Sequence, residues 1–231
     1  MIRNIIFDMG GVLLDYSPKR YISYLTADEA DAALLLREVF NSVEWFRLDR
    51  GTISQEEAAA AMRSRLPARL HDAVERLIEW WKLEVHPVEG MAELLAELKS
   101  LGYGLYLLSN ASARHPEYFD RLPSAQYFDG RFVSAFYKLL KPQYDIYHAM
   151  LREFDLKAEE CFFVDDSVAN VEAAYCVGIS GAIFDGDVDR LRALLNQAGV
   201  PVKPESYHSS IKSAISLPGR NPGIAMGIDS K

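Results

Sequence analysis

The sequence predicts an α/β fold in which a parallel sheet is interrupted, after its first strand, by an inserted block of helices. Over residues 87–202, short apolar runs alternate with amphipathic segments, as in parallel sheets that carry helices on both faces. Residues 16–86 carry only helical patterns. Polar residues follow several of the apolar runs, at the strand ends where such sheets bind ligands. These observations predict a sheet domain made of residues 1–15 and 87–202.

The first predicted strand covers residues 2–7, a compact apolar run rich in isoleucine. It ends at Asp8, shortly before the pair Gly10 and Gly11. A short apolar run stopped by glycines is typical of a buried strand in a parallel sheet. Residues 12–14 are expected to form a second short extended piece.

The block from Tyr16 to His86 is dominated by Ala, Leu, Glu and Arg, with no convincing strand. Ser54 followed by Glu57 predicts a capping box that opens a helix. Because the block follows the first strand directly, we expect it to cover the functional site as a cap. The aromatic residues of the block are predicted to lie mostly in its core. Candidates for the substrate side are Trp45, Phe46, Arg47 and Arg50.

Alternation of helices and strands resumes after the block. Apolar residues at helical spacing between residues 91 and 101, followed by Gly102, predict a helix with a C-terminal glycine. The remaining strands are predicted at residues 105–108, 131–134, 161–164 and 181–184. The remaining helices are predicted at 142–154, where Pro142 would lie in the first turn, between Asp166 and Gly178, and at 189–197. Residues 203–231 are rich in Ser, Pro, Gly and Lys, and we expect a tail.

Composition narrows the class of protein. The chain has 231 residues, 49% of them hydrophobic and 25% charged, which is ordinary for a globular domain. Its formal net charge of -8, with scattered Lys and Arg, disfavours nucleic acid and anionic membranes as partners. Cys161 and Cys176 each lie in an apolar context, so two buried free thiols in a reducing compartment are expected. Together with the absence of a long apolar run, this favours a cytoplasmic protein.

Five polar residues are predicted to meet at the carboxyl edge of the sheet. They are Asp8, Ser109, Lys141, Asp165 and Asp166. The adjacent acids Asp165 and Asp166 would repel each other, and together with Asp8 they form an oxygen-rich set that suits Mg²⁺.

The stretches that carry these residues resemble the haloacid dehalogenase-like (HAD) hydrolase superfamily. They are IIFDMGGVLLD, YLLSN, LLKP and FFVDDSVANVEAA, in the order and spacing of that family. The stretch WFRLDRGTIS in the helical block is similar to the helical cap of phosphatases in the superfamily. The resemblance implies a Rossmann-like core with an inserted all-α cap and a small phosphorylated substrate.

The resemblance also implies roles for individual residues. Asp8 matches the nucleophile, which forms an aspartyl-phosphate, and Lys141 matches the catalytic cation. Lys138 is a rival for Lys141, but the Lys-Pro pair is the pattern of the family. Ser109, Asn110 and Gly11 are the implied substrate contacts.

The implied metal is Mg²⁺, held by Asp8, the carbonyl of Gly10 and Asp166, with Asp165 in or next to the set of ligands. Haloacid dehalogenases of the superfamily need no Mg²⁺, so the adjacent acids Asp165 and Asp166 favour a phosphatase over a dehalogenase.

One position departs from the pattern. Most phosphatases of the superfamily carry a second aspartate two residues after the nucleophile, as a general acid, and here that residue is Gly10. Three explanations stay open: a substrate with a good leaving group, a substitute acid such as Asp15 or a cap residue, or a protein that binds phosphometabolites and turns them over poorly. The similar Asp-x-Gly branch includes sugar-phosphate phosphatases, which favours a sugar phosphate, above all a 1-phosphate.

Overall fold

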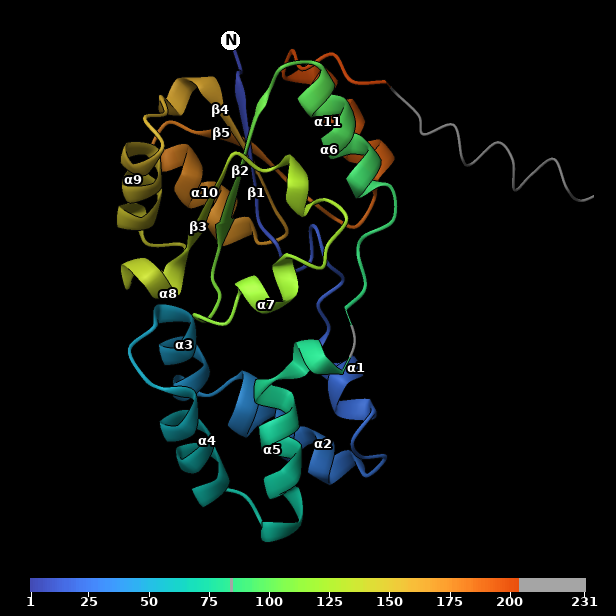
Figure 1. The fold of residues 1–231 in the computed structure, drawn as a ribbon, viewed down its shortest axis with the longest axis vertical. Helices are drawn as coiled ribbons and strands as arrows, with labels where there is room; N and C mark the ends of the chain where they lie inside the picture. The colour runs from blue at the N-terminus through green and yellow to red at the C-terminus, as the bar shows by residue number, and fades with distance from the viewer. Residues whose placement is uncertain (84, 204–231) are drawn as a thin grey trace, which may run out of the picture.

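The structure, a computed structural model, describes residues 1–83 and 85–203. Five parallel strands form one sheet in the order β3-β2-β1-β4-β5 (Figure 1). The strands are β1 (Asn4–Phe7), β2 (Gly104–Ser109), β3 (Gly130–Val133), β4 (Cys161–Asp165) and β5 (Ser180–Ile183). The predicted α/β class with a parallel sheet is confirmed.

Helices cover both faces of this sheet. On one face, Ile5 and Phe7 of β1 belong to an apolar cluster that includes the buried residues of α6 (Met91–Ser100) and α11 (Val188–Gln197). On the other face, Ile6 belongs to a cluster with α9 (Tyr144–Glu153) and α10 (Val168–Cys176). Successive residues of a strand point to opposite faces. Burial on both faces explains why the strands are continuous apolar runs in the sequence.

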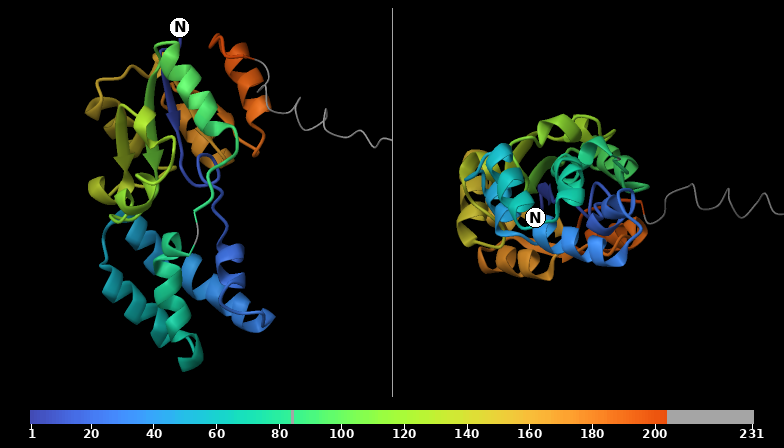
Figure 2. Two further views of the ribbon diagram at one scale, coloured as in Figure 1. Left: turned by 45° about the vertical axis from the view of Figure 1, so that its right-hand side comes forward. Right: turned by 90° about the horizontal axis from the view of Figure 1, so that it is seen from below.

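The segment between β1 and β2 is helical. From Tyr16 to Leu83 the described chain contains helices and turns but no strand. Figure 1 shows this helical block beyond the carboxyl ends of the strands, and the left view of Figure 2 shows the same arrangement after rotation. Its elements are α1 (Pro18–Ser23), α2 (Glu29–Leu35), a π-helical turn (Leu36–Phe40), α3 (Val43–Arg50), α4 (Gln55–Ser64), α5 (His71–Ile78) and two 3₁₀ turns (Ala68–Leu70 and Trp80–Lys82).

Side-chain caps set the starts of the helices in the block. The predicted capping box of α4 is present: the Glu57 N–H donates to Ser54 Oγ at 3.1 Å, and the Ser54 N–H donates to Glu57 Oε2 at 3.0 Å. Ser42 accepts from the Trp45 N–H and so begins α3. Gly51, with a φ of 69°, ends α3 in the left-handed conformation. These local signals fix where α3 begins and ends.

Three predicted elements differ in detail. Val12 and Leu13 lie in a turn and not in a strand, because the N–H groups of Leu13 and Leu14 both donate to the Met9 carbonyl, at 2.8 and 3.0 Å, while Leu14 forms only isolated β-bridges with Gly10 and Pro87. The third strand ends at Val133, and Ser134 opens α8 (Ser134–Tyr137).

The helix expected to include Pro142 begins two residues later. A turn closed by the Gln143 N–H on the Leu140 carbonyl, at 2.9 Å, precedes α9, so Pro142 lies before that helix and not in its first turn.

Other expectations have mixed outcomes. Both cysteines are free, and Cys161 is buried as predicted, but Cys176 is exposed on α10. No helix within the described residues is both long enough and apolar enough to cross a bilayer. The predicted tail lies outside the described residues from residue 204 onward. The remaining short elements are α7 (Pro116–Phe119) and 3₁₀ turns at Ala125–Tyr127 and Ala158–Glu160.

His115, which precedes α7, generates a prediction about acid stability. It is 1% exposed, and its ring stacks on Phe119 with the centroids 4.9 Å apart. Burial, and then the charge of Arg131, lower the pKa of His115 to about 3. The neutral ring therefore stabilises the fold fully above about pH 6.5, the usual pKa of an unfolded histidine, and this contribution is lost as the pH falls toward 3.

The variant His115→Phe keeps an aromatic ring and removes this titration. We expect the free energy of unfolding, measured with denaturant at several pH values below about 6.5, to fall more steeply for the wild type than for the variant. The difference should reach up to about 1.4 kcal/mol per pH unit. Parallel stability curves for the two proteins would mean that His115 is not held neutral.

Candidate active site

Parallel strands bring polar side chains to one edge of the sheet. Asp8 directly follows β1, Ser109 ends β2, and Asp165 ends β4. Phe7 pairs with Val164 across the β1–β4 ladder, so the acids that follow these two residues lie side by side. The Asp8 N–H donates to the Val164 carbonyl at 2.9 Å and continues the ladder by one bond. The predicted convergence of these residues is present.

The ammonium group of Lys141 lies between two of the carboxylates. Its Nζ is 2.8 Å from Asp8 Oδ1 and 2.7 Å from Asp165 Oδ2, and 1% of the side chain is exposed. Burial alone would lower the pKa of Lys141, but the charges of Asp8 and Asp165 raise it above its usual value. The group is therefore a fixed positive charge. The rival, Lys138, donates instead to the Gly51 carbonyl.

Asn110 holds the backbone of Lys141 in place. Its Oδ1 accepts from the Lys141 N–H at 2.9 Å, and its Nδ2 donates to the Lys141 carbonyl at 3.0 Å. The sequence predicts Asn110 as a substrate contact, but both ends of its amide are committed to the loop that carries Lys141. Its side chain therefore acts on the position of the lysine.

Asp165 is surrounded by donors. It is fully buried. Its Oδ1 accepts from the Ser167 N–H at 2.8 Å and from Asn170 Nδ2 at 2.9 Å, while Oδ2 accepts from Lys141. The sequence reasoning did not single out Asn170; its spacing of five residues from Asp165, in the first turn of α10, is the signal that could have found it. Asp165 thus orients the lysine and is itself oriented by the start of α10.

Asp166 differs from its neighbour. It is exposed and has no ion pair among the residues that the structure describes. One carboxylate oxygen each from Asp8, Asp165 and Asp166 lie within 4.8 Å of one another. Burial raises the pKa of Asp8 to about 7 although Lys141 opposes the shift, and burial followed by Asp165 raises that of Asp166. Three carboxylates facing one ammonium are short of positive charge, and their oxygens suit a hard divalent cation.

The two glycines after Met9 have different surroundings. Gly11 has a φ of 77°, and a Cβ there would lie 2.3 Å from Asp166 Oδ2. Gly10 lacks a positive φ, and a Cβ there would meet Tyr16 Cβ at 3.5 Å, an ordinary contact. The positive φ and the close approach to Asp166 favour glycine at Gly11. Neither constraint applies at Gly10, the position where most phosphatases of the family carry the second aspartate.

A cavity of about 240 Å³ opens above Asp8. From the sheet edge it is lined by Asp8, Gly10, Ser109, Asn110 and Asp166. The opposite wall is mostly aromatic and aliphatic, formed by Tyr16, Trp45, Leu48, Ile78, Trp80, Trp81 and Tyr118. The strand-end residues and the helical block thus enclose one space.

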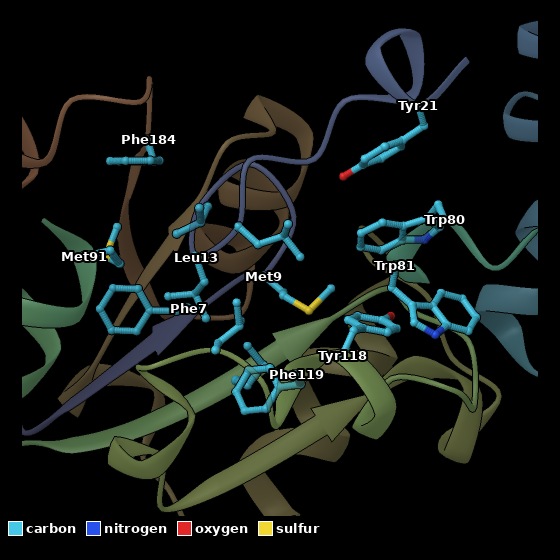
Figure 3. Close-up of a cluster of buried hydrophobic side chains, with 14 of the residues drawn as sticks. Phe7, Met9, Leu13, Tyr21, Trp80, Trp81, Met91, Tyr118, Phe119 and Phe184 are labelled. Atoms are coloured by element: carbon cyan, nitrogen blue, oxygen red, sulfur yellow. The ribbon is translucent and has the colours of Figure 1, made fainter. Parts of the chain in front are cut away.

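The aromatic wall joins the block to the sheet domain. Trp80 and Trp81 pack against Tyr118, with ring centroids 5.1 and 5.3 Å apart. Figure 3 shows these rings beside Met9, which follows Asp8. Of the residues predicted for the substrate side, Trp45 lines the cavity and Phe46 is 61% exposed.

Asp49, on the last turn of α3, also lines this cavity. The sequence analysis gave it no functional role, although it stands in the WFRLDRGTIS stretch. Asp15, which the sequence offers as a substitute acid, lies elsewhere: it pairs with Arg20 at 2.7 Å and lines a different cavity, with Gly11, His86 and Pro87.

Comparison with known proteins gives a consistent family. A family model of the haloacid dehalogenase-like hydrolases matches residues 2–178. The chain is 34% identical over 182 residues to the sesquiterpene phosphatase astK of Aspergillus oryzae, covering 76% of this chain and 86% of that protein. It is 28% identical over 221 residues to a phosphorylated carbohydrates phosphatase of Thermotoga maritima, covering 91% of this chain and 99% of the relative.

Solved structures share the fold. A HAD-like family hydrolase of Porphyromonas gingivalis superimposes with a TM-score of 0.64 at 26% identity, over 86% of this chain and 98% of the other. A HAD family enzyme of Bacteroides thetaiotaomicron, solved with magnesium and inorganic phosphate, gives a TM-score of 0.59 at 24% identity, over 83% of this chain and 99% of the other.

The two glycines provide a matched test of the acid cluster. Gly11→Ala should destabilise the metal-free protein by about 1–3 kcal/mol, because it combines a positive φ with a clash against Asp166. Gly10→Ala, with its nearest neighbour 3.5 Å away, should melt within a few degrees of the wild type. Thermal melting of both variants without added metal measures the difference. Equal loss of stability in both would show that the close approach of Gly11 to Asp166 is not a constraint.

Proposed function

The chain belongs to the haloacid dehalogenase-like hydrolases, and on this premise we propose that it hydrolyses a small phosphate monoester through an aspartyl-phosphate on Asp8. The observation that carries the proposal is the Asp8 carboxylate, ion-paired to buried Lys141 and open to the cavity. The phosphatase relatives of Aspergillus oryzae and Thermotoga maritima support the same reaction.

In the proposed reaction, a carboxylate oxygen of Asp8 attacks phosphorus, and the bond to the leaving oxygen breaks. Water then attacks the aspartyl-phosphate, releases inorganic phosphate and returns Asp8 to its carboxylate form. Lys141 is already placed by Asn110 and Asp165 to balance the negative charge of the phosphoryl group. Ser109, at the end of β2, and the backbone near Gly11 and Asn110 are proposed to hold the phosphoryl oxygens.

The site fits Mg²⁺, and we propose that Asp8, the Gly10 carbonyl and Asp166 hold it, with Asp165 next to the ligands. The fit rests on the clustered carboxylate oxygens and their shortage of positive charge. When bound, Mg²⁺ would polarise the phosphoryl group and lower the charge repulsion between it and Asp8. Asp165 already has donors on both oxygens, which favours Asp166 as the direct ligand.

We propose that residues 1–15 and 87–202 form the catalytic core and that residues 16–86 act as its cap. Support comes from the cavity, whose catalytic edge belongs to the first part and whose aromatic wall comes largely from the second. The cap would then select the organic group of the substrate.

A sugar phosphate is the first candidate substrate, as the carbohydrate phosphatase relative supports. The proposed preference for a sugar 1-phosphate follows from the absence of a general acid at Gly10. It holds only if no other acid can protonate the leaving oxygen. The phosphate of an apolar alcohol is a second candidate. It is favoured by the aromatic wall of the cavity and by the sesquiterpene phosphatase relative.

The proposed partner of the protein is this small phosphorylated substrate, and the proposed location is the cytoplasm. The two free cysteines support a reducing compartment.

Phosphate release with Mg²⁺ tests the function. We expect turnover on a panel of sugar, acyl and prenyl phosphates, its loss with a chelator and its return with added Mg²⁺. Asp8→Asn should lower turnover at least about a thousandfold, because the nucleophile is removed. Asp15→Asn, which changes an exposed acid outside the cavity, is the matched control and should keep activity. Normal turnover by Asp8→Asn would refute the proposal.

Direct titration of Mg²⁺ tests the ligand set apart from activity. Asp166→Ala should weaken binding at least about tenfold. If calorimetry gives the same affinity as for the wild type, Asp166 is not a ligand.

A further inference from the structure

We propose that Asp49 is the general acid and base of this site and replaces the carboxylate that is absent at Gly10; the inference rests on the phosphatase function proposed above. Asp49 lies 41 residues after Asp8 in the chain, on α3 of the helical block, yet both residues line the cavity of about 240 Å³. Among the described residues that line this cavity, it is the one acid supplied by the helical block.

The end of α3 is attached to the sheet domain. The Ser134 hydroxyl donates to the Asp49 carbonyl at 2.5 Å and accepts from the Ala111 N–H at 2.9 Å. Ser134 is fully buried, and Ala111 lies two residues after Ser109, the last residue of β2. One buried hydroxyl therefore joins the backbone of Asp49 to the strand end where the phosphoryl group would be held.

A second contact lies two residues further along. Gly51 passes so close to α8 that a Cβ would be 2.2 Å from the Ala135 carbonyl oxygen, and the Lys138 ammonium donates to the Gly51 carbonyl. These contacts, with the Ser134 bond, fix Asp49 relative to the catalytic edge.

The surroundings of Asp49 favour the neutral form of its carboxyl group. Within the described residues it has no ion pair with Lys, Arg or His. Burial, and then the negative charge of Asp8, raise its pKa well above the usual value. The other titratable groups that face it are the phenols of Tyr16 and Tyr118, whose own pKa values are raised chiefly by burial. A neutral carboxylic acid is the form that can give up a proton to a leaving group.

Other groups fit the role less well. Asp15 is paired with Arg20 outside this cavity. Lys141 is held by two carboxylates, and its proton is fixed there. The raised pKa values of the two phenols make them weak acids.

The proposed proton transfers balance. As Asp8 attacks phosphorus, the bond between phosphorus and the leaving oxygen breaks, and the Asp49 carboxyl proton passes to that oxygen, which departs as the alcohol. Asp49 is then a carboxylate. In the second step it takes a proton from the attacking water, whose oxygen bonds to phosphorus as Asp8 is released. Asp49 ends protonated, ready for the next turnover.

This role changes the expected substrate preference. With an acid in place, the wild type has no need for a good leaving group, and the preference expected from Gly10 alone should instead appear when Asp49 is changed. Leaving-group dependence is therefore the property that separates a proton donor from a residue that only shapes the cavity.

The test uses two aromatic phosphates of similar size, benzyl phosphate, which releases an alcohol, and 4-nitrophenyl phosphate, which releases an acidic phenol. Asp49→Asn should lower kcat/KM for benzyl phosphate about 10²–10⁴-fold and that for 4-nitrophenyl phosphate less than about tenfold. The ratio kcat/KM is used because it reports the steps through departure of the leaving group. Asp49→Glu should recover part of the benzyl phosphate activity. Asp15→Asn should leave both values unchanged.

A similar fall for both substrates, or no change for either, would overturn the role of Asp49. Melting of Asp49→Asn, which is nearly isosteric, should stay close to that of the wild type, and Asp49→Glu provides a second variant if it does not. If the wild type hydrolyses neither these two phosphates nor any phosphate of the panel above, or Asp8→Asn remains active, the phosphatase function itself fails. If Asp8→Asn is inactive while Asp49→Asn loses both activities equally, only the role of Asp49 fails.

Discussion

The buried ammonium group of Lys141, placed between Asp8 and Asp165, is the interaction on which the site depends. A charged group inside a protein is costly unless it is paired and hydrogen-bonded, and removal of one partner of such a pair typically costs about 3–5 kcal/mol. Here Lys141 contacts two carboxylates at 2.7 and 2.8 Å with almost no exposure to solvent. The acids at the sheet edge can lie close together because this charge lies between them.

The surrounding residues maintain that arrangement. The Asn110 amide makes hydrogen bonds to both the N–H and the carbonyl of Lys141. Ser167 and Asn170 supply the remaining donors to Asp165. The pairing of β1 with β4 places Asp8 and Asp165 next to each other. Since every one of these contacts is internal to the sheet domain, the lysine can be held before any substrate arrives. Asp166, which has no ion pair among the described residues, is the acid proposed as the direct ligand of a cation.

The helical block completes the site from the opposite side. Its apolar cluster is continuous with one face of the sheet, and Trp80 and Trp81 extend this packing to Tyr118. The attachment of Asp49 and Gly51 to α8 then sets the distance between the block and the catalytic edge. Packing and hydrogen bonding together give the cavity a polar floor and a largely aromatic wall. This combination is typical of sites that bind the charged group of a ligand and enclose its organic part.

Sequence patterns predict the alternation of strands and helices, the helical segment between the first two strands and the meeting of Asp8, Ser109 and Asp165 at one edge of the sheet. These features depend on local hydrophobic periodicity and on the rule that parallel strands end at the same edge. Residues 12–14 look like a strand by composition, but Val12 and Leu13 lie in a turn because two N–H groups donate to the Met9 carbonyl. The partner of the Asn110 amide depends on contacts between segments that are distant in the sequence.

Tertiary structure also brought Asp49 to Asp8. An acid near the end of a helix gives no periodic signal of which residues it will meet. For Asp49 this depends on how α3 docks against α8, which begins at Ser134, 84 residues after Arg50 ends α3. Local patterns determine which elements form, whereas contacts between distant elements determine which polar groups share a cavity and which are used to hold each other.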